Sequence, residues 1–158
     1  GLDFDDGGKI ASTGTVNNKL LEQLNALNFY KEIPPKSLGL EWVKSNIFPL
    51  IDSYNLEVKD VLSTYVEHVA MQIANAIGSD NQKSVLITGG GAYHKFLIKR
   101  LKEYSKNELV IPSKTIVEFK EALIFAFLGV LKLNDECNCL QSVTGAKRDH
   151  SSGKIYLP

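Results

Sequence analysis

Three consecutive glycines lie where a predicted strand meets a predicted helix. The apolar run from Ser84 to Thr88 is typical of a short buried strand, and Gly89, Gly90 and Gly91 follow it directly. A helix that begins after such a turn directs backbone N–H groups and the positive end of its dipole at the carboxyl edge of a sheet, where α/β proteins bind ligands. Glycine leaves the main chain open to a ligand and permits a positive φ. The triplet is therefore a candidate ligand site, although a tight turn without ligand has the same pattern.

Two familiar nucleotide-binding motifs are absent around this triplet. The dinucleotide pattern G-x-G-x-x-G would need a small residue where His94 stands, and G-x-x-x-x-G-K-[ST] occurs nowhere in the chain. A nucleotide at this turn would therefore be bound by a loop of a different kind.

Carboxylates form two further candidates. Glu118 and Glu121 are three residues apart and share one face of a predicted C-terminal helix, where a carboxylate could accept sugar hydroxyls. A glutamate that favours the helix start through the dipole is the alternative. The acidic segment Asp3–Asp6 resembles the start of a calcium loop, but Gly14 stands where the bidentate carboxylate would be required, which favours a solvated turn. No paired nucleophile and base can be identified, so we expect no catalytic residue in this chain.

The cysteines and histidines do not predict a metal site. Cys137 and Cys139 are one residue apart, which is poor spacing for a disulfide. A zinc site would need two more ligands at set spacing, and His68, His94 and His150 are scattered. We expect two reduced cysteines without chemistry.

Composition indicates one ordinary soluble domain over residues 1–158. Hydrophobic residues make up 44% of the 158 positions, and 18 Lys and Arg balance 18 Asp and Glu. That balance argues against nucleic acid or a membrane surface as a partner. No apolar run approaches the roughly 20 residues of a spanning helix, and the acidic N-terminus is unlike a signal peptide. The expected location is the cytoplasm.

The first half of the chain predicts one strand and three helices. We expect a strand over Lys9–Val16 from its β-branched residues, then a short helix capped by Asn17 or Asn18. Pro34–Pro35 should stop this helical region, and Pro49 should end or bend the next one. Apolar residues recur at three- and four-residue steps from Glu57 to Ile77, which predicts a long helix closed by the glycine that follows.

The second half alternates strands with helices. After the run ending at Thr88, the pattern predicts a helix over Ala92–Tyr104, a strand over Leu109–Ile111 and a helix over Val117–Leu133. An edge strand is expected at Lys154–Leu157. This alternation is typical of an α/β fold with a largely parallel sheet.

Six segments, in order, resemble the C-terminal half of the 1,6-anhydro-N-acetylmuramic acid kinases, bacterial sugar kinases of the actin, hexokinase and Hsp70 superfamily. The resemblance covers nearly the whole chain and is specific through the combination of its motifs. The segments are Asp5–Asn17 with the following Leu20–Leu21, Pro34–Gly39, Asp60–Glu67, Ile87–Ala92, Lys120–Phe127 and Ser142–Ala146.

The resemblance implies an actin-like (ribonuclease H-like) ATPase half-domain, with a mixed sheet and helices on both faces. It implies a cytoplasmic enzyme that uses ATP and Mg²⁺ to phosphorylate O6 of the sugar after water opens the anhydro bond, in peptidoglycan recycling. Gly89, Gly90 and Gly91 are then expected near the nucleotide, and Glu121 at the sugar pocket. The implied partners are the small-molecule sugar, the N-terminal half of the same enzyme and a second copy in a homodimer.

The chain also departs from the family pattern. The family enzymes are roughly twice as long, and their general base and phosphate loops belong to the N-terminal half, so this chain alone is expected to be inactive. Tyr93–His94 replaces the usual histidine-asparagine after the triplet, and Leu62 replaces a usual glutamine. A C-terminal fragment and a degenerate relative both fit these departures.

Two other functions remain open from the sequence. One is a non-catalytic actin-like module that binds nucleotide or a partner chain, and the other is a different sugar or acyl kinase of the same superfamily. The coding sequence upstream of Gly1 would discriminate among them.

Overall fold

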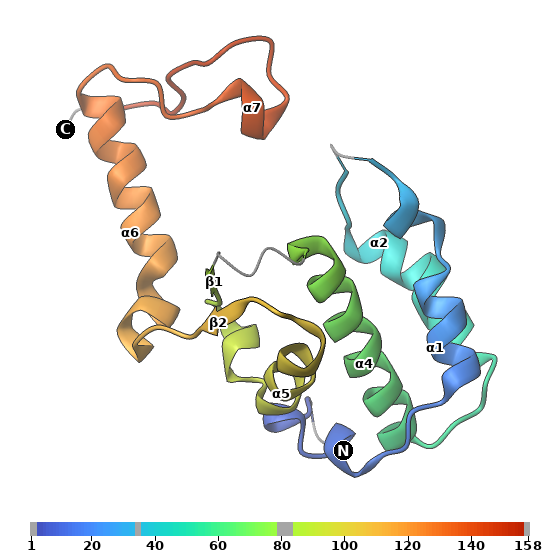
Figure 1. Ribbon diagram of the computed structural model, residues 1–158. Coiled ribbons are helices and arrows are strands. Elements are labelled where there is room, and N and C mark those ends of the chain that lie inside the picture. Colours follow the sequence, from blue (N-terminus) through green and yellow to red (C-terminus); the bar gives the residue numbers. More distant parts are fainter. Residues whose placement is uncertain (1–2, 34–35, 79–83, 157–158) are drawn as a thin grey trace. The chain divides into compact units, whose positions relative to one another are not determined.

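The computed structural model describes residues 3–33, 36–78 and 84–156 as a mixed α/β chain that is mostly helical (Figure 1). The chain forms two compact units, Gly1–Pro112 and Ser113–Pro158, which we call the N-terminal unit and the C-terminal unit. The expected stop at Pro34–Pro35 lies outside the described residues. A single domain over residues 1–158 stays a prediction.

The segment before the first helix is a loop with two 3-10 turns, η1 (Asp6–Gly8) and η2 (Ala11–Thr13). The Asp5 carboxylate accepts the N–H groups of Ile10 and Ala11 at 2.8 and 2.9 Å. Such local bonds occupy backbone donors that a strand would need for pairing. The strand predicted for this segment is therefore wrong, because the Asp5 side chain offers the backbone an alternative that outweighs β propensity.

Helix α1 (Asn18–Asn25) begins where the sequence predicted, with Asn17 as its N-cap. The Asn17 side-chain oxygen accepts the Leu20 N–H at 3.0 Å, which satisfies one donor of the first turn. Leu20 and Leu24 lie one turn apart, are fully buried and pack with Ile47. These three side chains form the hydrophobic core of this region.

The next helical stretch runs through a proline. It consists of α2 (Leu40–Trp42), a π-helical segment η4 (Val43–Ile47) and α3 (Phe48–Asp52), which follow one another directly. Pro49 has no N–H to donate and its ring crowds the preceding turn. The backbone therefore widens to π-helical spacing just before the proline, and the helix continues.

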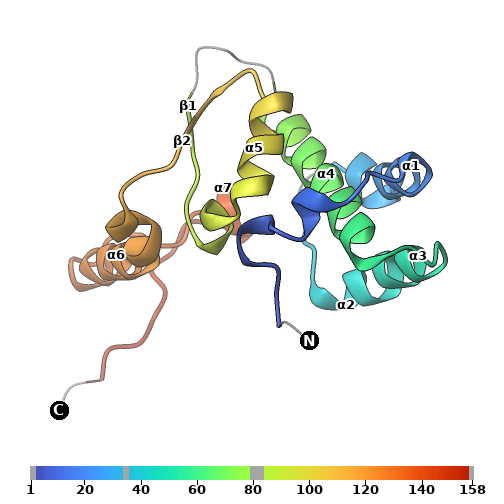
Figure 2. The same ribbon diagram turned by 90° about the horizontal axis from the view of Figure 1, so that it is seen from below.

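The long helix α4 (Val58–Ile77) lies at the centre of the N-terminal unit. Apolar periodicity predicted this helix, and Gly78 closes it as predicted, with a φ of 76° and an N–H bond to the Ala74 carbonyl at 3.1 Å. Helix α1 packs on one side of α4, and α5 (Lys95–Tyr104) packs on another (Figures 1 and 2). Segments from the beginning and from the end of the unit's sequence therefore both pack on α4.

The N-terminal loop is bonded to the first turns of α4. The Thr15 N–H donates to the Asp60 carboxylate at 2.7 Å, and the Asn17 N–H donates to the Thr64 hydroxyl at 2.9 Å. Gly14 lies so close to the helix that a Cβ there would overlap the Lys59 carbonyl group. A glycine at position 14 thus permits the close approach of loop and helix.

The sheet within the described residues has two parallel strands, β1 (Ser84–Leu86) and β2 (Glu108–Val110), paired in the register Ser84 to Glu108. Helix α5 connects them, which confirms the predicted strand, helix, strand order. The sheet is smaller than the mixed sheet expected, and β1 is not the buried strand predicted, since Leu86 is 58% exposed. Parallel strands are normally covered on both faces, so these strands lack part of their usual cover.

The C-terminal unit is built around α6 (Lys114–Leu133), which begins three residues before the predicted start, and contains the short α7 (Gln141–Thr144). Asn138 holds the chain after α6 by donating to the Ser152 carbonyl at 3.1 Å and accepting the Ser152 N–H at 2.7 Å. The edge strand is wrong for Lys154–Tyr156, which have no secondary structure. In the described parts of the chain, no helix has the length and apolarity to cross a membrane.

Candidate functional site

The glycine triplet forms the turn between β1 and α5, as the sequence predicted. After β1, the Ile87 N–H still donates to the Val110 carbonyl at 2.8 Å, and the chain then turns at Gly89, whose φ is 76°. The 3-10 segment η5 (Gly90–Tyr93) follows, with the Ala92 N–H bonded to the Gly89 carbonyl at 3.0 Å. The first N–H groups of such a segment have no partner inside it, so their partners must come from outside the segment.

Backbone geometry accounts for only one of the three glycines. Gly89 needs a positive φ, which side chains resist, whereas Gly90 and Gly91 do not. A Cβ built on any of the three would meet nothing within 4 Å in the described structure. The surface over Gly90 and Gly91 is therefore open, and the tight-turn explanation does not account for glycine at these two positions.

His94 ends the turn and starts α5. Its Nδ1 accepts the Leu97 N–H at 3.1 Å, so His94 is the N-cap of the helix and we assign its proton to Nε2. The departure from the family pattern at Tyr93–His94 therefore leaves α5 with a capping side chain. This cap positions the helix end whose dipole faces the turn.

The N-terminal loop packs directly on the start of α5, which sequence reasoning missed (Figure 2). Gly8 has a φ of 78°, and a Cβ there would overlap the His94 ring and lie 2.6 Å from the Phe96 Cβ. No periodic pattern links these positions, because the contact joins segments that are distant along the chain. Gly8 is thus required both for its own backbone and for the approach to His94.

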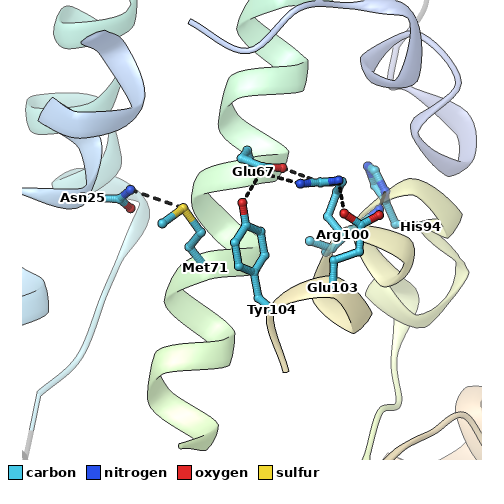
Figure 3. Close-up of polar contacts among 8 residues, drawn as sticks. Asn25, Glu67, Met71, His94, Arg100, Glu103 and Tyr104 are labelled. Carbon is cyan, nitrogen blue, oxygen red and sulfur yellow. Dashed lines mark hydrogen bonds and ion pairs between the residues drawn. The ribbon is translucent and has the colours of Figure 1, made fainter. Parts of the chain in front are cut away.

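A buried carboxylate connects α4 with α5. Glu67, 6% exposed, accepts from Arg100 Nε at 2.5 Å and from Arg100 Nη2 at 2.7 Å, and the Tyr104 hydroxyl also donates to it (Figure 3). Arg100 bonds Glu103 as well, on the exposed side of α5. Burial opposes ionisation of Glu67, but the bonds from Arg100 and Tyr104 outweigh it and hold the pKa of Glu67 below its ordinary value.

The sequence contains one indication of this ion pair, which is a glutamate on the apolar face of a helix. Glu67 follows Val66 on the core side of α4, where an unpaired charge would be costly. The sequence could have indicated that some cation pairs with Glu67. It could not have identified Arg100, since that choice depends on how α5 is rotated against α4.

His68 is buried in the N-terminal unit, with 1% of its surface exposed. Burial lowers the pKa of His68 to about 4, so its ring is neutral. Its Nδ1 lies 2.7 Å from the Asn25 side-chain oxygen and its Nε2 lies 2.9 Å from the Tyr30 hydroxyl. These bonds connect α4 to α1 and to η3 (Asn28–Lys31), away from the glycine turn.

Glu121 and Glu118 lie on α6, in the C-terminal unit, whereas the glycine turn lies in the N-terminal unit. Both glutamates are exposed, and the Glu118 carboxylate lies 3.6 Å from Lys114 Nζ. Since α6 begins at Lys114, Glu121 lies about two turns inside the helix. The dipole acts within the first turn, so a role in helix initiation does not account for Glu121.

Comparison with known proteins gives one family over the whole chain. The family described as anhydro-N-acetylmuramic acid kinase matches residues 1–158. The anhydro-N-acetylmuramic acid kinase of Coxiella burnetii is 35% identical over 98% of this chain and 43% of its own length. The corresponding kinases of Sulfurimonas denitrificans and Hahella chejuensis are each 31% identical, over 99% and 96% of this chain and 46% and 43% of their own lengths. This chain therefore spans less than half the length of these curated relatives, and it belongs to the anhydro-N-acetylmuramic acid kinase family.

Proposed function

We propose that this chain is the C-terminal part of an ATP-dependent kinase that converts 1,6-anhydro-N-acetylmuramic acid to N-acetylmuramic acid 6-phosphate in peptidoglycan recycling. In that reaction water opens the anhydro bond, and the freed O6 takes the γ-phosphoryl group of ATP. The observation that carries the proposal is family membership over residues 1–158. The cytoplasm, where ATP is available, is the proposed location.

The glycine turn is the proposed nucleotide site. Open space over Gly90 and Gly91 lets a phosphate or ribose approach the main chain, and the N-terminus of α5 favours an anion. ATP would supply the phosphoryl group. The chain's own part is to present backbone N–H groups in a fixed direction, because phosphoryl transfer depends on positioning and on neutralised charge.

Magnesium is proposed to accompany ATP, carried largely by the phosphates. Within residues 3–33, 36–78 and 84–156 there is no group of three or more His, Cys, Asp or Glu that could hold a metal ion. We therefore propose no magnesium ligand among these residues.

The N-terminal half of the kinase is the proposed partner of this chain, and a homodimer is a further proposal. Helix α6 supports the N-terminal half as a partner. Val117 is the one buried residue among the described residues of α6, while Leu123, Phe125 and Phe127 are 59–70% exposed. The part of α6 over residues 122–131 has no charged residue on any side, and such a helical segment is normally enclosed by protein. Further strands and helices from the other half would cover such surfaces and complete an actin-like fold.

The proposed function is tested with the complete kinase, meaning this chain joined to an N-terminal half of the length found in the relatives. With ATP, magnesium and 1,6-anhydro-N-acetylmuramic acid, mass spectrometry should detect N-acetylmuramic acid 6-phosphate. Nucleotide binding without any phosphorylated sugar would instead support a non-catalytic module. Turnover of a different sugar would support another kinase of the superfamily.

Glu121→Gln in the complete kinase tests the proposed sugar site. The amide keeps the shape of the side chain but replaces charge-assisted bonds by neutral ones that are about half as strong. We expect the sugar KM to rise or kcat to fall, with the ATP KM nearly unchanged. Glu22→Gln, at an exposed position of α1, is the matched control and should leave sugar kinetics unaltered. Normal sugar kinetics in a folded Glu121→Gln protein would remove Glu121 from the site.

A further inference from the structure

The bond between Glu67 and Arg100 controls the orientation of α5. Arg100 presents two parallel N–H groups to the two carboxylate oxygens, at 2.5 and 2.7 Å, and Tyr104 donates from the next turn of the same helix (Figure 3). A bidentate contact between two planar groups restricts direction as well as distance. Rotation of α5 about its own axis would therefore break bonds to a carboxylate that is itself buried.

The same helix determines where the glycine turn points. Arg100 lies six residues after the N-cap His94, about 9 Å along the helix at ~1.5 Å per residue. The turn Gly90–Tyr93 is continuous with that N-cap through the bond from the His94 N–H to the Gly91 carbonyl at 3.1 Å. A shift of α5 would therefore carry the N–H groups of the turn with it.

A second contact supports the start of α5 from another side. Gly8 packs against His94 and Phe96, and its loop is bonded to α4 through Thr15 and Asp60. The loop blocks movement of the helix start in one direction, while Glu67 and Arg100 restrict rotation. Both contacts fix α5 relative to α4, because the loop and Arg100 are each bonded to residues of α4.

We propose that Glu67 is a positioning residue for the nucleotide, acting through Arg100 on α5 and the Gly90–Tyr93 turn, an inference that rests on the proposed nucleotide site at that turn. Buried ion pairs add little net stability relative to apolar side chains, so stability alone is a weak reason for this pair. The N-terminus of α5 lies at the proposed ligand site. A bidentate ion pair fixes the direction of such a helix, which a non-directional apolar contact does not do. Glu67 touches neither ATP nor the sugar in this proposal.

A purely structural role predicts a different result. If the pair only holds α4 against α5, its loss lowers the melting temperature and leaves the KM for ATP unchanged in the protein that remains folded. A positioning role raises the ATP KM selectively, because binding groups moved by a fraction of an ångström lose their alignment.

The test is Glu67→Gln in the complete kinase, with steady-state KM values for ATP and for the sugar and a melting curve. We expect the ATP KM to rise by about 10- to 100-fold, with the sugar KM within about twofold of the unaltered protein. Glu103→Gln is the matched control, since it replaces the charge-assisted bond between this side chain and Arg100 by a neutral one but leaves α4 and α5 connected through Glu67. Leu24→Ala, in the core around Leu20 and Ile47, controls for lowered stability.

Other outcomes overturn the proposal. They are an unchanged ATP KM in folded Glu67→Gln, a parallel rise in both KM values, and an equal rise in Leu24→Ala. If Glu67→Gln does not fold, Arg100→Lys replaces it, because lysine keeps the charge for Glu67 but lacks the planar fork, and the same selective rise is expected. Gly90→Val distinguishes a failure of the nucleotide site from a failure of the positioning role. An unchanged ATP KM in that variant rejects the nucleotide site itself, whereas a rise there without one in Glu67→Gln rejects only the positioning role.

Discussion

The 158-residue chain produced alone is expected to give no phosphorylated sugar above background when incubated with ATP, magnesium and 1,6-anhydro-N-acetylmuramic acid. The resemblance of this chain to the C-terminal half of the family enzymes leads us to expect the general base and the phosphate loops in the N-terminal half. A positioned general base contributes about 10²- to 10⁴-fold to a rate, and loss of the phosphate loops adds to this.

The measurement is isotopic transfer from γ-labelled ATP to the sugar, with the complete kinase as the positive control. Circular dichroism on the same sample should show a helical spectrum, which separates an inactive folded chain from an unfolded one. Adding the separately produced N-terminal half should restore turnover if the two halves associate. Turnover by the folded chain alone would contradict the assignment of the base to the other half.

Gly90→Val in the complete kinase is expected to weaken ATP binding by about tenfold or more, about 1.4 kcal/mol, without unfolding the protein. The φ of Gly90 is not positive and a Cβ there meets nothing within 4 Å among the described residues, so we expect valine to be accommodated without backbone strain. What the valine would occupy is the open space that the proposed site leaves for the nucleotide. The effect on stability should stay within the roughly 0.5 kcal/mol typical of surface substitutions.

Isothermal titration calorimetry with ATP measures this effect. Gly90→Ala should give an intermediate loss, because its side chain is smaller, and a graded series is expected only if a ligand occupies the space. Gln23→Val introduces the same side chain at an exposed position of α1 and is the matched control. Equal ATP affinity in the unaltered kinase and in all three variants would mean that the triplet is only a structural turn.

The sequence predicted the elements whose causes are local. Helix α4 follows from apolar residues at three- and four-residue steps and from Gly78, and the start of α1 follows from its cap Asn17. The strand, glycine turn and helix around Gly89 were likewise predicted, since turn chemistry and periodicity change within a few residues. A local preference could also mislead: β-branched residues predicted a strand over Lys9–Val16, but the Asp5 carboxylate binds two N–H groups of that segment, which forms a loop with the 3-10 turn η2.

The family motifs, the long helices and the position of the glycine turn were thus determined by the sequence itself. Only the tertiary structure showed that Gly89 alone of the triplet needs a positive φ, that Gly8 packs on His94 and that Arg100 pairs with Glu67. Gly8 and His94, like Glu67 and Arg100, are far apart in the chain, and each pairing depends on how one packed segment is rotated and translated against another. Periodicity identifies the face of a helix that is buried, but the partner on that face is selected by packing, which places donor and acceptor within bonding distance.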